Sequence, residues 1–224
     1  MSTASTQPVP SPLPPGDPER KGALIVFEGI DGSGKSTQAR ALVQDLLTRG
    51  ILAEYSFEPT QGQHGGRLRE MWALEKRHDA KEELELFRLD RMEHVTNLIE
   101  PGLRAGNVIV LDRYYYSSIA YQGSQSKLSP RKVEKAMREF APQPDIAFFF
   151  ELSIEKALER ITHGRNDIPN ILEKKENLEK VARVYKKMNS PEIVRIRAER
   201  DREELYREIW ARTYPVLSQL GIIA

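Results

Sequence analysis

The stretch Gly-Ile-Asp-Gly-Ser-Gly-Lys-Ser, from Gly29 to Ser36, decides how the rest of the chain is organised. It follows the apolar run Ala23–Phe27 and precedes Thr37 and a segment with helical periodicity. A buried strand, a glycine-rich turn with the spacing G-x-x-x-x-G-K-[ST] and a helix, in this order, are typical of a phosphate-binding loop. Its glycines let backbone N–H groups approach phosphate oxygens, and the helix N-terminus adds positive field there. The sequence therefore predicts a polyphosphate site.

The residue types of this loop predict their roles. Lys35 is expected to reach the β- and γ-phosphates, and the Ser36 hydroxyl to ligate a Mg²⁺ ion that bridges them. A chance glycine-rich turn is the alternative, and the strand before the loop and the helix after it argue against that alternative. The predicted ATP-binding residues are Gly29, Ile30, Asp31, Gly32, Ser33, Gly34, Lys35, Ser36 and Thr37.

Composition limits the classes of partner. The chain has 224 residues, of which 39% are hydrophobic, enough for one good-sized core. Its 34 Lys and Arg against 33 Asp and Glu leave a net charge of +1, which gives no electrostatic reason to expect nucleic acid or a membrane surface as a partner. The absence of cysteine excludes disulfides and thiolate metal sites. With no apolar stretch near about 18 residues and no signal pattern, we expect a cytoplasmic protein.

The first 21 residues differ in composition from the rest. Residues 1–21 are rich in Ser, Thr and Pro and contain few large aliphatic side chains. Such a segment cannot bury enough surface to offset the entropy lost on ordering. We expect a disordered tail, with a regulatory or docking role as the alternative, followed by a single domain over residues 22–224.

Beyond residue 22, short apolar runs alternate with helical periodicities, which is typical of parallel strands joined by crossover helices. Pro101 and Pro215 predict a break or kink near Glu100 and within the last helix. Strands are predicted over residues 23–27, 51–57, 107–111, 145–152 and 192–196. Helices are predicted over 38–48, 67–76, 81–103, from 129 onward, 153–162, up to about 187 and 201–220.

A second group of polar residues follows the predicted strand over 107–111. Asp112 and Arg113 come directly after it, and the carboxyl ends of parallel strands gather ligands at one edge of the sheet. Asp112 is expected to hold Mg²⁺ directly or through water, and Arg113 to clamp a phosphate. A mutual ion pair without a ligand is the alternative.

One helical face carries Phe87, Asp90, Arg91 and His94. A ring and a guanidinium one turn apart can stack on a base and bond its edge. Periodicity alone favours the alternative, in which Phe87 belongs to the core and Arg91 pairs with an acidic neighbour on the helix surface.

Three segments resemble the thymidylate kinases. Phe27–Gln38 is similar to their nucleotide loop, Phe87-x-x-Asp90-Arg91-x-x-His94 to their central helix, and Asp112–Gly123 to the signature after their third strand. The resemblance runs from about residue 22 to residue 185 and thins beyond.

This resemblance implies a three-layer α/β fold of the P-loop type, with a five-stranded parallel sheet flanked by helices and a short helical lid at about residues 160–173. It also implies a homodimer and ATP-dependent phosphorylation of dTMP to dTDP with Mg²⁺. Phe87 would stack on thymine, Arg91 would bond the base edge and Arg113 would hold the acceptor phosphate. Asp31 would meet the sugar 3′-hydroxyl, Tyr121 would crowd the 2′ position, and Ser118 and Gln122 would line the base pocket. Ordinary packing or helix-surface hydrogen bonding is the alternative for each of these residues.

The chemistry calls for positive charge rather than for a base. The attacking phosphate oxygen is already mostly ionised at neutral pH, so no histidine base is needed. Family members place an arginine in the nucleotide loop or on the lid, and this loop carries Gly32 and Ser33 instead. Arg160 and Arg165 are therefore the candidate catalytic arginines beside Lys35 and Arg113, with a solvated surface as their alternative role.

Two segments depart from the family pattern. Residues 57–62 read Phe-Glu-Pro-Thr-Gln-Gly, where bacterial members usually show Arg-Glu-Pro-Gly-Gly-Thr, and Ile171–Glu173 replaces the usual aromatic-Glu pair of the lid. Both changes concern the acceptor side. A kinase for another nucleoside monophosphate or a deoxynucleoside, or a non-catalytic nucleotide-binding switch, therefore remain alternatives.

Overall fold

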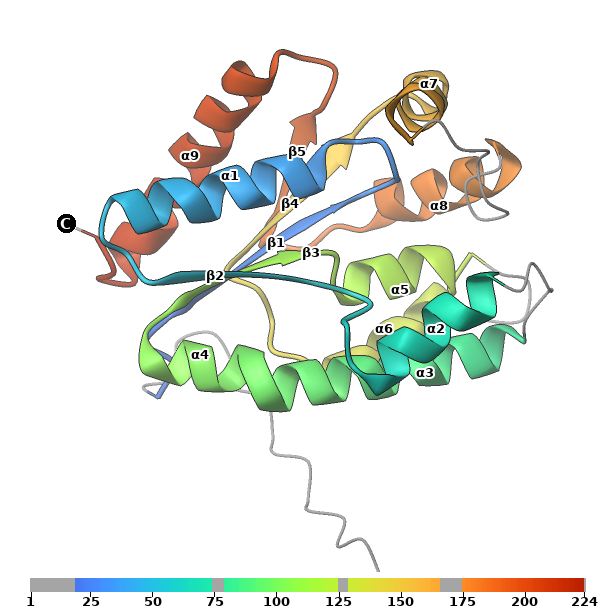
Figure 1. Cartoon of the computed structure of the whole chain (residues 1–224), viewed down its shortest axis with the longest axis horizontal. Coiled ribbons are helices and arrows are strands. Elements are labelled where there is room, and N and C mark those ends of the chain that lie inside the picture. Colours follow the sequence, from blue (N-terminus) through green and yellow to red (C-terminus); the bar gives the residue numbers. More distant parts are fainter. Residues whose placement is uncertain (1–18, 74–78, 125–128, 166–174, 224) are drawn as a thin grey trace, which may run out of the picture.

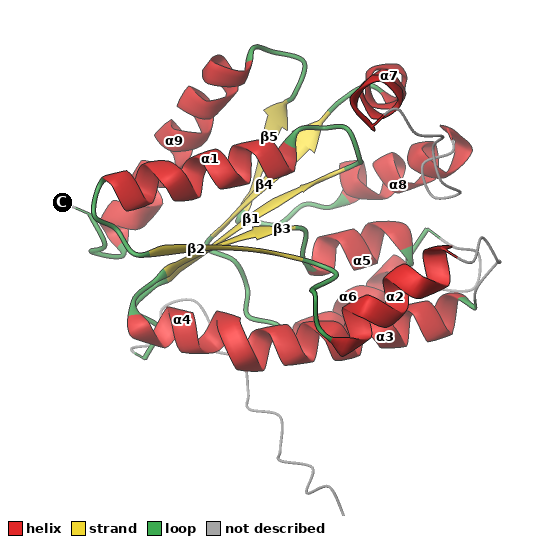
Figure 2. Ribbon diagram, in the orientation of Figure 1, coloured by secondary structure: helices red, strands yellow, loops and turns green. Residues whose placement is uncertain are grey.

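The computed structural model describes residues 19–73, 79–124, 129–165 and 175–223 of the chain. Its centre is a five-stranded sheet in the order β2-β3-β1-β4-β5, and every neighbouring pair of strands is parallel (Figure 2). The all-parallel α/β fold predicted from the sequence is therefore confirmed. The strands are β1 (Ala23–Gly29), β2 (Ala53–Phe57), β3 (Val108–Asp112), β4 (Ile146–Glu151) and β5 (Ile193–Arg197).

Helices cover both faces of this sheet (Figure 1). Helices α1 and α9 lie on one face, and α3 to α6 and α8 lie on the other. The helices are α1 (Lys35–Thr48), α2 (Gln63–Ala73), α3 (Ala80–His94), α4 (Glu100–Ala105), α5 (Tyr115–Tyr121), α6 (Pro130–Arg138), α7 (Ile154–Arg165), α8 (Lys175–Lys187) and α9 (Arg202–Gln219). Among the described residues, no helix combines the length and the hydrophobicity that a membrane span requires.

The core divides along the sheet because side chains alternate between the two faces of a strand. Leu24 and Val26 of β1 point into the layer formed with α4, α5, α6 and α8. Ile25 and Phe27 point into the layer formed with α1 and α9. Both faces of β1 are thus buried, as expected for the central strand of a parallel sheet.

The break predicted near Glu100 takes the form of a π-helical turn, η1 (Val95–Ile99), which joins α3 to α4. The backbone N–H of Glu100 donates to the carbonyl of Val95, five residues earlier. Pro101 has no N–H and its ring collides with the preceding helical turn, so the wider turn accommodates it. The helix therefore continues through the proline rather than stopping there. Pro215 likewise lies inside α9.

The last residues of the segment predicted to be a tail, residues 1–21, pack against the domain. Arg20 is 7% exposed and pairs with Asp145, whose carboxylate also accepts a hydrogen bond from the backbone of Leu24. This ion pair joins the segment before β1 to the start of β4. Of the predicted tail, residues 1–18 lie outside the described residues.

Candidate active site

The carboxyl ends of β1, β3 and β2 bring the two predicted polar groups together. In the parallel register, Phe27 of β1 pairs with Asp112 of β3, which in turn pairs with Phe57 of β2. The phosphate loop leaves β1 two residues after Phe27. The Asp112-Arg113 pair and the loop therefore share one edge of the sheet, as the topology predicted.

The loop backbone uses conformations that glycine adopts readily. Gly32 has φ +77° and Gly34 has φ +91°, both in the left-handed region. A Cβ atom on Gly32 would lie 2.6 Å from the carbonyl oxygen of Ala157 in α7. Gly34 directly precedes α1, so that Lys35, Ser36 and Thr37 form the first turn of this helix rather than preceding it as the periodicity suggested. The helix N-terminus thus opens directly onto the loop.

Lys35 is held inside this loop. Its side chain is 6% exposed, and Nζ lies 3.7 Å from a carboxylate oxygen of Asp31 and 3.5 Å from the carbonyl oxygen of Ile30. Burial and the nearby Arg113 lower the pKa of Lys35, and the carboxylates of Asp31, Asp112 and Glu28 offset part of that effect. Polyphosphate bound in the loop would place further negative charge beside Lys35 and so favour its charged form.

Asp112 has one carboxylate oxygen in use and one without a partner. Tyr55 donates to Oδ2 over 3.3 Å, whereas buried Oδ1 has no hydrogen-bond partner among the described residues. Burial, followed by the charge of Asp112, raises the pKa of Tyr55 to about 12. A buried carboxylate oxygen and the hydroxyl of Ser36 are the hard oxygen donors that Mg²⁺ prefers, and Mg²⁺ usually keeps water as its other ligands.

Asp31, Arg113 and Tyr121 form one cluster. Arg113 Nη2 donates to Asp31 Oδ1 over 2.8 Å and lies 3.4 Å from the Tyr121 hydroxyl. That hydroxyl donates to Asp31 Oδ2 over 3.2 Å. Arg113 thus forms an ion pair with the phosphate loop, whereas the sequence alternative paired it with its neighbour Asp112. Three residues predicted for the acceptor side meet at the loop that is predicted to hold the donor.

Arg113 has φ +72°, which makes it the single non-glycine residue with positive φ in the described part of the chain. A side chain in this conformation carries backbone strain that the surroundings must offset, and such strain is concentrated at functional sites. The Arg113 N–H donates to the carbonyl oxygen of Phe27 over 2.9 Å. The turn after β3 is therefore tied to β1.

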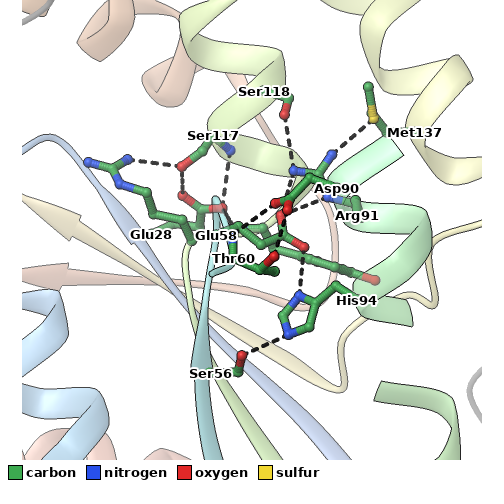
Figure 3. Close-up of polar contacts among 12 residues, drawn as sticks. Glu28, Ser56, Glu58, Thr60, Asp90, Arg91, His94, Ser117, Ser118 and Met137 are labelled. Atoms are coloured by element: carbon green, nitrogen blue, oxygen red, sulfur yellow. Dashed lines mark hydrogen bonds and ion pairs between the residues drawn. The ribbon is translucent and has the colours of Figure 1, made fainter. Parts of the chain in front are cut away.

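Arg91 is buried in a polar network (Figure 3). Its Nε and Nη2 donate to Glu58 Oε2 over 2.8 and 2.6 Å, and Nη2 also donates to the Ser118 hydroxyl over 3.0 Å. His94 Nδ1 lies 3.1 Å from Glu58 Oε1, and His94 Nε2 lies 2.8 Å from the hydroxyl of Ser56. The acidic partner of Arg91 is thus a buried residue after β2, not a neighbour on the helix surface.

This arrangement keeps Glu58 ionised. Burial by itself raises the pKa of Glu58, but Arg91 and the hydrogen-bonded His94 outweigh it, and the net effect lowers the pKa. A buried ion pair with several hydrogen bonds of this kind is costly to break from one side. The Glu58 network therefore holds the end of β2 against α3.

The remaining base-site candidates lie near this network. Phe87 is partly exposed, and its ring centroid lies 6.0 Å from that of Trp72 in α2. Asp90 accepts hydrogen bonds from the N–H and hydroxyl of Thr60 over 2.8 and 2.6 Å, and so anchors the loop after β2. Gln122 is buried, and its Oε1 has no partner among the described residues.

Of the two lid arginines, Arg160 can be described. Its Nη1 donates to the carbonyl oxygen of Gly32 over 3.4 Å and its Nη2 to that of Ala198 over 3.1 Å. An exposed guanidinium therefore lies against the phosphate loop. The side chain of Arg165, and the lid segment with Ile171–Glu173, lie outside the described residues.

With this geometry in view, comparison with known proteins decides the family. A model of the thymidylate kinase family matches residues 27–209. The chain belongs to the thymidylate kinase family.

Thymidylate kinases from several bacteria align with most of the chain. The thymidylate kinase of Desulfotalea psychrophila is 40% identical over 190 residues, which span 84% of the chain and 92% of the relative. That of Brachyspira hyodysenteriae is 42% identical over 189 residues, with 84% and 92% covered. That of Akkermansia muciniphila is 41% identical over 187 residues, with 84% and 89% covered. Family membership makes the chain a phosphotransferase with ATP as co-substrate.

The sequence did not predict the buried carboxylates that hold residues of the thymidylate kinase site in place. Glu58 and Glu28 are almost completely buried and accept hydrogen bonds from residues far along the chain. The one available signal was their place at or next to a strand's carboxyl end. The structure also buries all three tyrosines of residues 114–116 in the core.

Proposed function

We propose that this member of the thymidylate kinase family transfers the γ-phosphate of ATP to dTMP, giving ADP and dTDP. The observation that carries the proposal is the position of Asp31. Its carboxylate lies 2.8 Å from Arg113 on the acceptor side and 3.7 Å from Lys35 on the donor side. A single loop residue thus contacts both cations that a phosphoryl transfer between two polyanions requires.

On the donor side, the phosphate loop binds ATP. Backbone N–H groups of residues 29–34 and the first turn of α1 surround the phosphates, and Lys35 neutralises the β- and γ-phosphates. Arg160, which touches the Gly32 carbonyl, is the described candidate for neutralising the transferred group, and Arg165 is the second candidate. The main catalytic contribution is the placement of positive charge where the transferred group gains negative charge.

A divalent cation fits the donor set of this site. Ser36 and Asp112 would hold Mg²⁺, and the unpartnered Oδ1 of Asp112 supports that assignment. When bound, the ion neutralises charge on the phosphates and favours the in-line arrangement.

On the acceptor side, Arg113 holds the phosphate of dTMP. Asp31 meets the 3′-hydroxyl, and the Tyr121 ring occupies the space that a 2′-hydroxyl would need. The contacts among these three residues support the assignment, because they place the residue assigned to the phosphate next to the two residues assigned to the sugar. The acceptor oxygen is ionised at neutral pH, so no protein base takes part.

The thymine base lies between Phe87 and the buried polar groups beyond it. The partly exposed Phe87 ring supplies the stacking surface. Gln122 Oε1, which has no partner among the described residues, is an acceptor for a donor on the base edge. Arg91 Nη1 contacts the sulfur of Met137, a weak acceptor, and can bond a base oxygen instead. Ser118 closes the pocket by holding Arg91.

Transfer of radiolabel from γ-labelled ATP tests the function. The purified full-length chain with Mg²⁺ should label dTMP and reach its highest kcat/KM with dTMP among dTMP, dUMP, dCMP, dGMP and deoxythymidine. Lys35→Ala should lower kcat at least about 1,000-fold while the protein stays folded. Failure of the folded protein to label any acceptor contradicts the proposal, and a preference for another acceptor contradicts the base assignment.

We also propose, from family membership, that the chain acts as a homodimer. Sedimentation equilibrium on the purified protein decides between a mass near 25.6 kDa and twice that value.

A further inference from the structure

A buried carboxylate that the proposed mechanism does not use lies directly behind Arg113. Glu28, next to the end of β1, is 0% exposed. Its Oε1 accepts hydrogen bonds from the N–H groups of Tyr114 and Ser117, over 2.8 and 3.1 Å. Tyr114 is the N-cap residue of α5 and Ser117 lies in its first turn, where N–H groups lack the usual acceptor four residues earlier; the Ser117 N–H also donates to the carbonyl of Tyr114 over 3.0 Å. Glu28 of β1 therefore supplies the side-chain cap that the N-cap residue of α5 does not provide.

The other oxygen of Glu28 is bound by two hydroxyls. Ser117 donates to Oε2 over 2.6 Å (Figure 3), and Tyr185 donates to the same oxygen over 2.8 Å. Burial raises the pKa of Glu28, and these hydrogen bonds act in the opposite direction. A buried carboxylate with four donors has a strongly determined position, since each donor would be costly to leave unpaired.

Ser117 connects this cluster to Arg113, the residue proposed to bind the acceptor phosphate. Arg113 Nη1 donates to the Ser117 hydroxyl over 3.0 Å. Arg113 itself lies in the turn between β3 and α5, in the strained conformation with φ +72°. The guanidinium of Arg113, through Ser117, and its main chain, through the next residue, Tyr114, are thus both tied to groups that Glu28 holds.

Tyr185 reaches this cluster from α8. It lies 157 positions from Glu28 in the sequence and is 6% exposed. Its ring packs edge-on against Phe149, with centroids 5.4 Å apart and planes at 88°. Its hydroxyl also lies 3.0 Å from that of Ser117. Because the core fixes the ring, the Tyr185 hydroxyl has a defined position relative to the Glu28 carboxylate and the Ser117 hydroxyl.

We propose that Tyr185 is a positioning residue for the acceptor phosphate: through Glu28 and Ser117 it keeps Arg113 in its strained conformation, aimed at the phosphate of dTMP. The inference rests on the proposed role of Arg113 as the acceptor-phosphate ligand. It makes α8, which packs against α5 and α7, part of the acceptor machinery. On the donor side, Lys35 is joined to this relay only indirectly among the described residues, through Asp31, which contacts both Lys35 and Arg113.

The first test compares two tyrosine-to-phenylalanine variants. Tyr185→Phe should raise KM for dTMP and lower kcat/KM for dTMP about tenfold, with KM for ATP changed less than about twofold. Tyr116→Phe is the matched control, because it also removes one hydrogen bond from a buried tyrosine to a buried carboxylate, that of Glu192. It should leave both KM values unchanged. Equal effects of the two variants on dTMP and ATP would mean a general loss of stability and would overturn the proposal.

A double-mutant cycle tests the path. If Tyr185 acts through Ser117, Tyr185→Phe and Ser117→Ala should each lower kcat/KM for dTMP, and the double variant should fall by much less than the product of the two effects. Effects that multiply show separate actions and overturn the relay.

A crystal structure of the Tyr185→Phe protein decides the inference independently of turnover. The expected result is an Arg113 with φ outside the left-handed region or with its contact to Ser117 lost. An unchanged Arg113 overturns the positioning role, even where label transfer succeeds. Failure of label transfer in the unaltered protein would instead contradict the proposed function.

Discussion

Nη2 of Arg113 lies 2.8 Å from Oδ1 of Asp31, although 82 positions separate the two residues in the sequence. The ion pair joins the turn after β3 to the phosphate loop after β1. Both side chains are partly accessible, with exposed fractions of 16% and 24%. The two residues proposed to meet the phosphate and the 3′-hydroxyl of the acceptor are therefore held together by the fold itself.

Replacing Arg113 by lysine should separate charge from geometry. Lysine keeps the positive charge but loses the planar fork that contacts Asp31 and Ser117 at once. We expect kcat/KM for dTMP to fall about 100-fold, and KM for ATP to stay within about twofold. Arg138→Lys, which alters an ion-paired arginine on α6, is the matched control in steady-state assays. An unchanged kcat/KM in Arg113→Lys would remove Arg113 from the acceptor site.

Tyr121 should control discrimination against ribose. Tyr121→Ala opens space beside Asp31, so the preference for dTMP over ribothymidine monophosphate, measured as a ratio of kcat/KM values, should fall about tenfold. Tyr121→Phe keeps the ring and loses only the hydroxyl contact to Asp31, and should preserve that ratio. If Phe and Ala reduce the ratio equally, the hydroxyl and not the bulk of the ring excludes the 2′-hydroxyl.

Arg160 should act on the transfer step. Arg160→Ala removes the guanidinium next to the Gly32 carbonyl, and we expect kcat to fall about 100-fold with little change in KM for dTMP. Lys156→Ala, one turn earlier on α7, removes an exposed cation paired with Glu199 and should have no such effect. A drop in Arg165→Ala that is absent in Arg160→Ala would assign the catalytic role to Arg165.

Glu58→Gln should destabilise the protein in a pH-dependent way. At pH 7 it leaves buried Arg91 without its charged partner, and the free energy of unfolding should fall by about 3 kcal/mol. The pKa of Glu58 in the folded protein is below its ordinary value of 4.5, so its stabilising contribution is present above pH 4.5 and is lost as the pH falls through the folded-state pKa. Urea unfolding curves should therefore converge for the two proteins in acid.

The exposed pair of Glu85 and Arg88 provides the control for this experiment. Glu85→Gln should cost about 0.5 kcal/mol or less, because solvent screens the pair. A Glu58→Gln effect equally small at pH 7, or independent of pH, would show that the Glu58 network contributes no ionic stabilisation.

Two glycines of the phosphate loop should differ in their tolerance of a methyl group. Both Gly32 and Gly34 have positive φ, so alanine at either position costs about 1–2 kcal/mol of backbone strain. Only at Gly32 does the Cβ atom also collide with the carbonyl oxygen of Ala157, at 2.6 Å, whereas nothing lies within 4 Å at Gly34. Thermal unfolding without nucleotide should therefore show a larger fall in Tm for Gly32→Ala. Equal Tm values would contradict the packing of the loop against α7.

Local sequence patterns were enough to predict several parts of this protein. The phosphate loop is a contiguous motif, the strands were recognisable as short apolar runs, and the helices by their period of 3.6. The rule that ligands gather at the carboxyl ends of parallel strands was enough to bring Asp112 and Arg113 to the loop. Helix α5 escaped prediction because its N-terminal cap comes from Glu28, on a strand 86 positions before Tyr114.

Which buried charges and hydroxyls contact one another became known only from the three-dimensional structure. Arg91 pairs with Glu58, 33 positions away, and Tyr185 bonds Glu28, 157 positions away. No periodicity encodes such pairs, because a buried charge is stabilised by whichever partner the packing of distant elements brings within hydrogen-bond distance. The local motifs therefore specified the phosphate chemistry, and the long-range contacts specified how Arg91 and Arg113 are aimed.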